Sequence, residues 1–477
     1  MRLYGHQGQG ATAGGIWTRP PACSGARGPQ WSATGKARRI ARGGRLWYVA
    51  SMTGQATAPP PEPTDAPPAA QTRGPWSVLR QRDFRLLCAG LLISNTGTRI
   101  QQLAQYWLLW ELTRSAWALG LYGLFRTVPF LGVSLYAGVL ADRLDRRRLL
   151  AWSNGASMVF PLAIGALVAA GRAEPWHIYL MALCSATADS FDNPARQALI
   201  PTLVPRAQLM SALSLMNGLR RIATLVGPSL GGLIILWLGT AGAFYVNGLS
   251  YGAVVIAALL MRAPLPTAGG ASTRAWSMVR EGLAYVRQHE ILGTLLAVET
   301  VVTLCTAYQS IMPVFADDVL GVGPAGLGLL MTAPGVGAVL GSIVLVSRGD
   351  VRAKGRWLLV SGGLFGLAML AFALSRDFVL SLAALAVVGC MDAVYAAVRN
   401  TIVQLAAPEA FRGRVVSVQT IAQRGLSPSG SFVTGSLAAM IGAPLAVAVL
   451  GVVTTALVLW RGLALPALRD YRDDASG

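Results

Sequence analysis

The sequence carries little charge for its length. Asp, Glu, Lys and Arg make up 13% of its 477 residues, about half of the share that soluble proteins usually carry. The three histidines are His6, His177 and His289, and the five cysteines are widely spaced without a paired motif. These absences exclude a zinc centre built on histidine and argue against a disulfide framework. We therefore expect no metal site and no cofactor.

Charge is missing altogether from three long stretches of the chain. Residues 149–171, 222–261 and 425–460 hold no charged side chain. A transmembrane helix needs about 20 apolar residues, so each of the two longer stretches has room for two helices and a tight turn. The sequence therefore predicts an all-α membrane protein with many spans.

The first part of the chain has a different composition. Residues 1–75 are rich in Gly, Ala, Arg and Pro and lack the apolar core of a secretory signal, which predicts a disordered tail. Residues 1–51 hold eight basic residues and no acidic one, out of a net charge of +19. We hypothesise that Met52 is the native start; the alternative is a basic arm that touches lipid. No folded module accompanies these charges, so we expect no nucleic-acid partner.

Apolar runs separated by charged breaks predict twelve transmembrane helices. The expected spans are 85–111, 117–140, 149–170, 176–199, 211–237, 241–261, 291–314, 324–347, 357–375, 378–403, 415–440 and 444–463. They form an N-terminal six-helix bundle at 80–261 and a C-terminal six-helix bundle at 291–463, with a linker at 262–290 and a tail at 464–477.

The two predicted halves resemble each other. "DSFDNPARQALIPTLVP" (189–205) and "DAVYAAVRNTIVQLAAP" (392–408) both read Asp-x6-Arg-x8-Pro, and they lie 203 residues apart. The long charge-free runs at 222–261 and 425–460 recur at the same offset. Two similar six-helix halves are typical of secondary transporters whose binding site lies between the halves.

Arg and Lys are unevenly shared between the two sets of loops. The richer set includes Arg146–Arg148 and Arg348–Arg356, whereas the opposite loops carry single arginines and the acidic pair Asp317 and Asp318. This asymmetry predicts that both termini are cytoplasmic. The linker contains "WSMVREGLAYVRQHE", which is either an amphipathic helix on the cytoplasmic face or a plain connection.

Three motifs resemble those of a known family. "GVLADRLDRRRLL" (138–150) is similar to the loop motif Gly-x-Leu-Ala-Asp-Arg-x-Gly-Arg-Arg of the major facilitator superfamily, with Asp145 in place of Gly. "GPSLGG" (227–232) resembles the core of the superfamily's antiporter motif. "DNPARQALIPTLVP" and "RGRVVS" resemble the branch that includes enterobactin exporters. The resemblance covers about residues 80–465, and it implies a two-bundle transporter of a bacterial inner membrane.

The resemblance also assigns roles to residues. The loop motif implies a conformational latch, whose arginines pair with carboxylates in one global state and release them in the other; the alternative is a plain orientation signal. The latch candidates are Gly138, Asp142, Arg143, Arg146, Arg147, Asp192 and Arg196. The antiporter-like motif offers a helix surface without bulky side chains for close packing, formed by Gly227, Pro228, Gly231 and Gly232.

Polar and ionisable side chains inside the spans are costly in a bilayer and are candidates for function. Burial favours the protonated carboxyl group, so a buried acid can bind and release a proton. The proton-coupling candidates are Glu299 and Asp392. The alternative is a permanent ion pair, Asp392 with Arg399 or Asp189 with Arg196. The candidates for the substrate cavity are Asn95, Arg99, Gln102, Arg126, Asn217 and Gln309.

The sequence therefore predicts a monomeric transporter that exports a small siderophore-like or drug-like molecule in exchange for protons. Import by symport is an alternative, and so is a non-transporting membrane sensor or assembly protein. We expect no enzyme, because the sequence shows no nucleophile–base constellation, metal-ligand cluster or phosphate loop.

Overall fold

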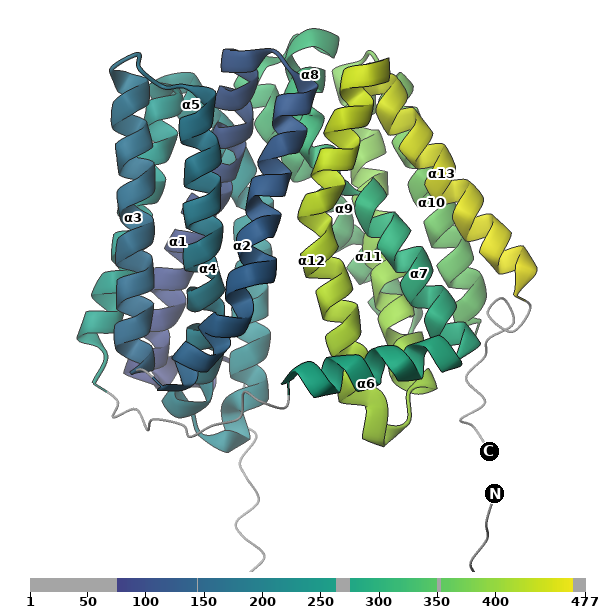
Figure 1. Ribbon diagram of the computed structural model, residues 1–477, viewed down its shortest axis with the longest axis horizontal. Coiled ribbons are helices and arrows are strands. Elements are labelled where there is room, and N and C mark those ends of the chain that lie inside the picture. The colour runs from purple at the N-terminus through teal and green to yellow at the C-terminus, as the bar shows by residue number, and fades with distance from the viewer. Residues whose placement is uncertain (1–74, 144, 263–274, 350–352, 466–477) are drawn as a thin grey trace, which may run out of the picture. The chain divides into compact units, whose positions relative to one another are not determined.

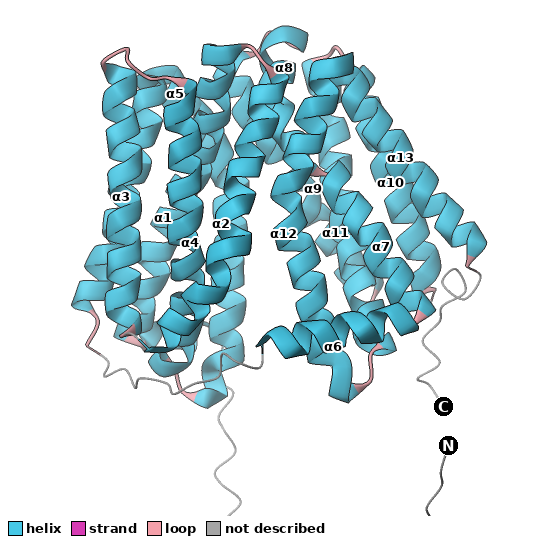
Figure 2. Ribbon diagram, viewed as in Figure 1, coloured by secondary structure: helices cyan, strands magenta, loops and turns pink. Residues whose placement is uncertain are grey.

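Helices make up the regular structure of the chain (Figures 1 and 2). The structure is a computed structural model that describes residues 75–143, 145–262, 275–349 and 353–465, all within one unit, Thr72–Gly477. The proposed start at Met52 and the two predicted tails lie outside the described residues, apart from short stretches next to the bundles.

The helices of the N-terminal half are α1 (Arg82–Thr113), α2 (Ala116–Arg143), α3 (Arg146–Ala169), α4 (Pro175–Leu203) and the long α5 (Leu209–Leu260), with short helices η1 (Pro75–Arg80) and η2 (Arg206–Gln208). After the linker helix α6 (Ala275–Gln288) come α7 (Glu290–Cys305), η4 (Ala307–Ile311), α8 (Met312–Val314), η5 (Phe315–Val319), α9 (Gly323–Arg348), α10 (Lys354–Leu374), α11 (Phe378–Ala406), α12 (Glu409–Ile441) and α13 (Ala443–Ala464).

Eleven of the twelve predicted spans coincide with one of these helices or with a segment of one. The charge-free run 222–261 turns at Gly239, whose φ of 70° lies in the region that glycine adopts easily, so α5 is two helices joined by a kink. The run 425–460 turns at Gly442 in the same way, with φ of 84°. Seven helices of the described chain are long and apolar enough to cross a membrane. The total of twelve crossings stays a prediction.

One span differs from its prediction. The segment expected to be one helix at 291–314 is α7 followed by the short helices η4 and α8. Pro313 lies in this broken stretch, and proline removes one backbone hydrogen bond and clashes with the carbonyl four residues earlier. The polar residues Thr306 and Gln309 precede Pro313 in this stretch.

The two halves contact each other through two equivalent pairs of helices. In the N-terminal half, α1 and α3 pack on α5, and α2 packs on α4. In the C-terminal half, α9 packs on α11, α10 on α13, and α7 on α12. Across the halves, α5 packs on α9 and α2 packs on α12 (Figure 1). Each cross-half pair joins the second span of one half to the fifth span of the other.

Among the described residues, the apolar core is continuous between the halves at one end only. The terminal end holds the start of α1, the linker helix α6 and the end of α13, and the opposite end holds Arg114 and Asp317 (Figure 1). Near the opposite end, one buried cluster combines Trp107 and Tyr122 of the first half with Phe315 and Phe372 of the second. At the terminal end each half has its own cluster, one around Phe84 and the other within the C-terminal half.

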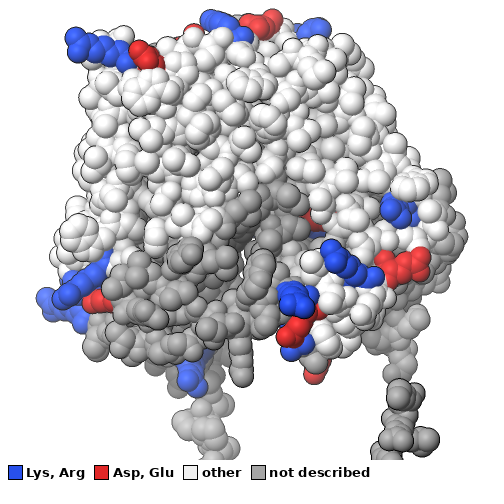
Figure 3. Space-filling model, viewed as in Figure 1, with Lys and Arg blue, Asp and Glu red and all other residues white. Residues whose placement is uncertain are grey.

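The surface between the two ends is apolar. On the face seen in Figure 3, charged side chains gather mostly toward the two ends. Large apolar side chains such as Leu236, Trp237 and Leu374 are exposed on the described helices. Exposed apolar side chains of this size are expected where a helix faces lipid rather than water.

Candidate functional site

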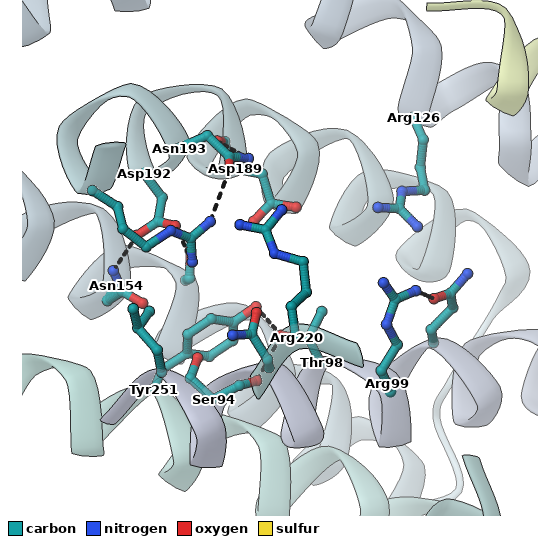
Figure 4. A pocket seen from close by; sticks show the side chains of 15 residues that line it. Ser94, Thr98, Arg99, Arg126, Asn154, Asp189, Asp192, Asn193, Arg220 and Tyr251 are labelled. Atoms are coloured by element: carbon teal, nitrogen blue, oxygen red, sulfur yellow. Dashed lines mark hydrogen bonds and ion pairs between the residues drawn. The ribbon is translucent and has the colours of Figure 1, made fainter. Parts of the chain in front are cut away.

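A cavity of about 170 Å³ lies within the N-terminal half and is lined by α1, α2, α3, α4 and α5. Its lining side chains are mostly polar (Figure 4). Among the described residues, no group of three His, Cys, Asp or Glu side chains is placed to hold a metal ion. The chemistry of the cavity is therefore carried by guanidinium, carboxylate and amide groups.

The cavity brings together four of the six predicted cavity residues. Asn95, Arg99 and Gln102 lie on one face of α1, as their helical spacing predicts. The Arg99 Nη1 atom donates a hydrogen bond to Gln102 Oε1 at 3.0 Å. Arg126 reaches the same cavity from α2. The helical period was therefore sufficient to identify this wall of the cavity.

Two of the latch candidates also line this cavity. Asp192 Oδ1 accepts a hydrogen bond from Asn154 Nδ2 at 2.7 Å, and Asp192 Oδ2 lies 3.4 Å from Arg196 Nη1. Arg196 Nη2 donates to Asn193 Oδ1 at 2.7 Å. A permanent ion pair of Asp189 with Arg196 was an alternative that the sequence left open, but the carboxylate that pairs with Arg196 is that of Asp192, one turn away. The network joins α3 to α4 inside one half.

The end of the loop motif between α2 and α3 contacts the first turn of α3. Asp145 caps α3, because its Oδ1 accepts from the backbone N–H groups of Arg147 at 2.9 Å and Arg148 at 3.4 Å. Such a cap satisfies backbone donors that the helix leaves without partners. Asp145 Oδ2 also lies 3.7 Å from Arg148 Nε. The departure from the family motif at this position therefore supplies a helix cap and a charged contact with a neighbouring arginine.

Arg147 contacts carbonyl groups rather than the predicted carboxylates. Its guanidinium donates to the carbonyl oxygens of Ala258 and Leu259 at the end of α5. A cation is favoured there because the last carbonyl groups of a helix have no partners and carry partial negative charge. The side chains of the other loop candidates, Gly138, Asp142, Arg143 and Arg146, lie outside the described residues. The latch stays a prediction for them.

The C-terminal half contains a buried ion pair. Arg399 Nη1 on α11 contacts Glu299 Oε2 on α7, and the two residues are 6% and 3% exposed. Thr303 Oγ1 donates to Glu299 Oε1 at 3.5 Å, and Arg399 Nη2 donates to Asn400 Oδ1 at 3.3 Å. The sequence proposed Asp392 as the partner of Arg399. Asp392 is instead exposed, two turns earlier on α11.

Each half therefore has a buried arginine at the equivalent position, and the two arginines have different partners. Arg196 on α4 and Arg399 on α11 occupy equivalent positions of the Asp-x6-Arg-x8-Pro motif, 203 residues apart. Both are buried and both contact a carboxylate. Asp192 is on the same helix as Arg196, whereas Glu299 is on another helix.

The antiporter-like motif lies where α5 meets α1 and α9. A Cβ atom on Gly227 would stand 2.4 Å from Arg99 Cβ, and one on Gly231 would stand 3.1 Å from Ile100 Cα. On the other side, a Cβ atom on Gly232 would stand 2.6 Å from the carbonyl oxygen of Pro324. Any side chain at these glycines would force the helices apart.

The contact between α5 and α9 also leaves no room for a side chain on α9. A Cβ atom on Gly328 would stand 2.6 Å from the carbonyl oxygen of Pro228. The hydroxyl groups of Ser229 and Thr332 are hydrogen-bonded at 2.7 Å across the same contact. The motif therefore includes a contact between the two halves as well as one within the first half.

A charged contact closes the opposite end. Arg114, which follows α1, contacts Asp317 and lies 3.7 Å from Asp318 Oδ1. Trp110 Nε1 donates to Asp317 Oδ2 at 3.0 Å, and the Arg114 guanidinium lies 5.5 Å from the centre of the Trp110 ring. Sequence reasoning noted these charges in loops on one side of the membrane but did not pair them. The opposite charges of Arg114 and of the two aspartates were the signal in the sequence that could have predicted this contact.

At the terminal end, a groove of about 1120 Å³ separates α5 from α9. Asn217, a predicted cavity residue, lies in this groove rather than in the cavity. Gln309, another predicted cavity residue, is in η4 and does not line the cavity either. Arg220 lines both the groove and the cavity.

Several cavity residues were missed from the sequence. Asn154, Arg220 and Tyr251 line it, and the Tyr251 hydroxyl lies 3.4 Å from Thr98 Oγ1. Asp189, considered only for the latch network or an ion pair, lines the cavity as well, and in Figure 4 its side chain and that of Arg220 point toward one another. A polar residue inside a charge-free run, such as Asn154, was a usable signal.

The linker helix is present and docks on α12. Tyr285 stacks on Phe411 with ring centroids 4.4 Å apart, and Arg414 Nη1 lies 3.1 Å from Glu281 Oε2. Gly282 packs against the backbone of Arg414, where a Cβ atom would stand 2.6 Å from the carbonyl oxygen. Of the two readings of the linker, the helical one holds for Ala275–Gln288.

Comparison with known proteins identifies relatives of the whole membrane unit. Residues 73–476 match the model of a family described as transmembrane secretion effector, MFS_3. The chain is 27% identical over 363 residues to the multidrug efflux pump Tap of Mycolicibacterium fortuitum, covering 74% of this chain and 88% of that protein. It is 27% identical over 371 residues to the enterobactin exporter EntS of Escherichia coli O1:K1 / APEC, covering 76% and 85%.

Solved structures share the fold. A bacterial homologue of the human lysosomal transporter Spinster, in an inward-facing and unoccupied conformation, aligns with a TM-score of 0.64 at 13% identity, covering 82% of this chain and 98% of that chain. A bacterial homologue of the iron transporter ferroportin, in an inward-facing state, aligns with a TM-score of 0.61 at 16% identity, covering 82% and 99%.

Proposed function

Because the chain belongs to the transmembrane secretion effector family of the major facilitator superfamily, we propose that it exports a small organic molecule in exchange for protons. The resemblance drawn from its loop motifs is confirmed, and so is the all-α membrane fold. The chain is a multi-pass membrane transporter and not an enzyme. Proton coupling, a siderophore-like or drug-like substrate, and an inner-membrane location with cytoplasmic termini are our proposals.

The observation that carries the proposal is the unequal contact between the halves. Arg114 and Asp317 join the halves at one end, and a shared apolar cluster lies near them. At the terminal end the cores are separate, and a groove lies between α5 and α9. A transporter that works by alternating access must pass through states open to one side only. With the terminal end in the cytoplasm, this arrangement corresponds to an inward-facing state.

Proton coupling is supported by the buried pair of Glu299 and Arg399. A proton on Glu299 would remove its charge and leave the Arg399 cation without its partner in a low-dielectric environment, which is costly. The protein would lower this cost by rearranging α7 against α11. Asp392, exposed on α11, would then offer Arg399 a second carboxylate. Proton binding and helix rearrangement would thus be linked.

Export, rather than import, is supported by the relatives. One is named a multidrug efflux pump and another an enterobactin exporter, and both are matched over most of their length. Import by symport and a non-transporting role remain the alternatives that a transport assay distinguishes.

The test uses inside-out membrane vesicles that contain the full chain and carry an imposed proton gradient. The pH inside the vesicles is followed with a fluorescent dye while a panel of siderophores and drug-like dyes is added. We expect at least one compound to dissipate the gradient in vesicles with the wild-type protein, and Glu299→Gln to abolish the effect. Glu290→Gln is the matched control, because Glu290 is exposed at the start of the same helix.

The proposal fails if no compound of the panel dissipates the gradient although the protein is present and inserted. Dissipation that persists unchanged in Glu299→Gln would leave export intact and remove Glu299 from the coupling.

A further inference from the structure

The cavity in the N-terminal half has an excess of positive charge. Four arginines line it, namely Arg99, Arg126, Arg196 and Arg220, against two aspartates, Asp189 and Asp192, which leaves a net charge of +2. Asp192 is engaged with Arg196. Charge buried among transmembrane helices is costly unless it is compensated. A cavity with this balance favours a negatively charged guest.

Two of the arginines approach the cavity from different helices, Arg99 from α1 and Arg126 from α2, whereas the side chain of Arg220 on α5 points toward Asp189 (Figure 4). In Figure 4 the side chains of Arg99 and Arg126 point toward one another across open space. Two cations that line the same cavity repel each other. An anion placed between them would turn this repulsion into two attractive contacts, and a guanidinium group binds carboxylate or phosphate with parallel hydrogen bonds.

The cavity is too small for a whole drug-sized molecule. Its volume is about 170 Å³, whereas sites for such ligands usually measure about 300–1,000 Å³. The neighbouring groove between α5 and α9 measures about 1120 Å³ and is lined largely by apolar side chains such as Leu225, Val339 and Ile343. Arg220 lines both spaces. A molecule with one acidic end and an apolar body would place its acidic end in the cavity and its apolar body in the groove.

We propose that the transported molecule is an amphipathic acid, whose anionic group binds between Arg99 and Arg126 and whose apolar body lies in the groove between α5 and α9. This inference rests on the proposed export function and specifies its substrate class. The anion neutralises the excess charge, and the groove supplies the apolar surface that the cavity lacks.

The test is a binding measurement on the full chain in nanodiscs of phosphatidylcholine, without any proton gradient. The probes are dansylglycine and dansylglycinamide, which have the same fluorescent body and differ in carrying a carboxylate or a neutral amide. We expect the acid to bind at least about tenfold more tightly than the amide, because the amide cannot form the charged contacts. Equal binding of the two probes would overturn the proposal.

Variants locate the site. Arg99→Gln and Arg126→Gln are each expected to bring the acid-to-amide ratio close to one, and Arg126→Lys, which keeps the charge, should retain part of it. Arg172→Gln removes an equal charge from an exposed turn and should leave the ratio unchanged. An unchanged ratio in the double variant Arg99→Gln/Arg126→Gln would overturn the proposal, provided that size-exclusion chromatography finds it folded.

A substitution in α9 tests whether the apolar body lies in the groove. Ser342 is exposed and lines the groove from α9. Ser342→Trp should fill the space and weaken dansylglycine binding at least about fivefold, whereas Ser342→Ala should not. Unchanged binding in Ser342→Trp would overturn the assignment of the apolar body to the groove.

The lipid bilayer is a competing source of amphipathic anions. Dansylglycine binding that is unchanged when part of the phosphatidylcholine is replaced by phosphatidylglycerol supports an exported acid as the occupant. Loss of binding under that exchange would assign the site to a lipid head group and overturn the proposal. Because binding is measured without a gradient, a preference for acids without gradient-driven export would refute the proposed function alone.

Discussion

Glu299 on α7 and Arg399 on α11 form a buried ion pair that joins two helices of the C-terminal half. Thr303 contacts the Glu299 carboxylate, Asn400 contacts the Arg399 guanidinium, and that guanidinium lies 5.5 Å from the centre of the Tyr395 ring. Such a pair is costly to break from one side, because the remaining charge stays buried.

Removing one partner of this pair should therefore destabilise the protein more than removing both. We expect Arg399→Gln to lower the free energy of unfolding by about 3 kcal/mol, and the double variant Glu299→Gln/Arg399→Gln to recover part of the loss. Thermal unfolding of the purified protein in detergent measures both. Glu281 and Arg414 provide the comparison: this pair is 50% and 35% exposed, so Arg414→Gln should cost less than about 1 kcal/mol. Equal losses at the two pairs would contradict the prediction.

The contact of Arg114 with Asp317 should bias the protein toward the state closed at that end. Asp317→Asn removes an ion pair that is partly exposed, worth about 1 kcal/mol, which changes a two-state ratio about fivefold. Spin labels on Trp117→Cys and Met440→Cys, both exposed near this end of α2 and α12, report the separation by pulsed electron paramagnetic resonance. We expect a larger population at long distances in Asp317→Asn.

The control for this measurement is Asp377→Asn. Asp377 caps α11 through a hydrogen bond from the backbone of Leu380 at 2.8 Å, and asparagine caps a helix about as well as aspartate. The distance distribution should stay that of the parent. A distribution insensitive to Asp317→Asn would show that the charged contact does not hold this end closed.

Two glycines of α5 should respond to alanine with opposite signs. Gly232→Ala places a Cβ atom 2.6 Å from the Pro324 carbonyl oxygen, so we expect a loss of about 1–3 kcal/mol from the displaced contact. Gly252→Ala meets nothing within 4 Å, so the better helix former should stabilise the protein by about 0.5–1 kcal/mol. The unfolding temperatures of the two variants decide the matter, and shifts of the same sign would refute the close-packing argument.

The cap on α3 gives a fourth prediction. Asp145→Ala should cost about 1 kcal/mol because two backbone donors lose their acceptor, whereas Asp145→Asn should cost little. The comparison is made by thermal unfolding, and the difference between the two variants should be independent of salt. An equal loss in both would mean that the charge contact with Arg148, rather than the cap, is what stabilises the turn.

The sequence predicted the position of the helices far better than the pairing of their side chains. Charge-free runs located the spans, and helical spacing identified the wall of Asn95, Arg99 and Gln102, because both follow from the local geometry of one helix. The partner of Arg399 could not be found in this way. Asp392 lies on the same helix and was the natural choice, but the choice of Glu299 depends on how α7 packs against α11.

The repeat carried information that single positions did not. The offset of 203 residues that relates Arg196 to Arg399 also relates Gly239 to Gly442, the two glycines with positive φ at which the charge-free runs turn. The sequence predicted a tight turn in each run from length alone. The sequence could not predict the break between α7 and α8 in this way. The turns were predicted from the length of the charge-free runs, and the break lies outside those runs.

The glycines at the junction of the halves have a consequence for how the protein moves. Gly120 on α2 and Gly435 on α12 meet backbone to backbone, as Gly232 and Gly328 do on α5 and α9. Helices that touch through bare backbone have no interlocked side chains at the point of contact, so they can turn against each other without passing through a badly packed intermediate. We therefore expect one half to rotate slightly against the other about these two crossings, which would bring the separated ends together and part Arg114 from Asp317.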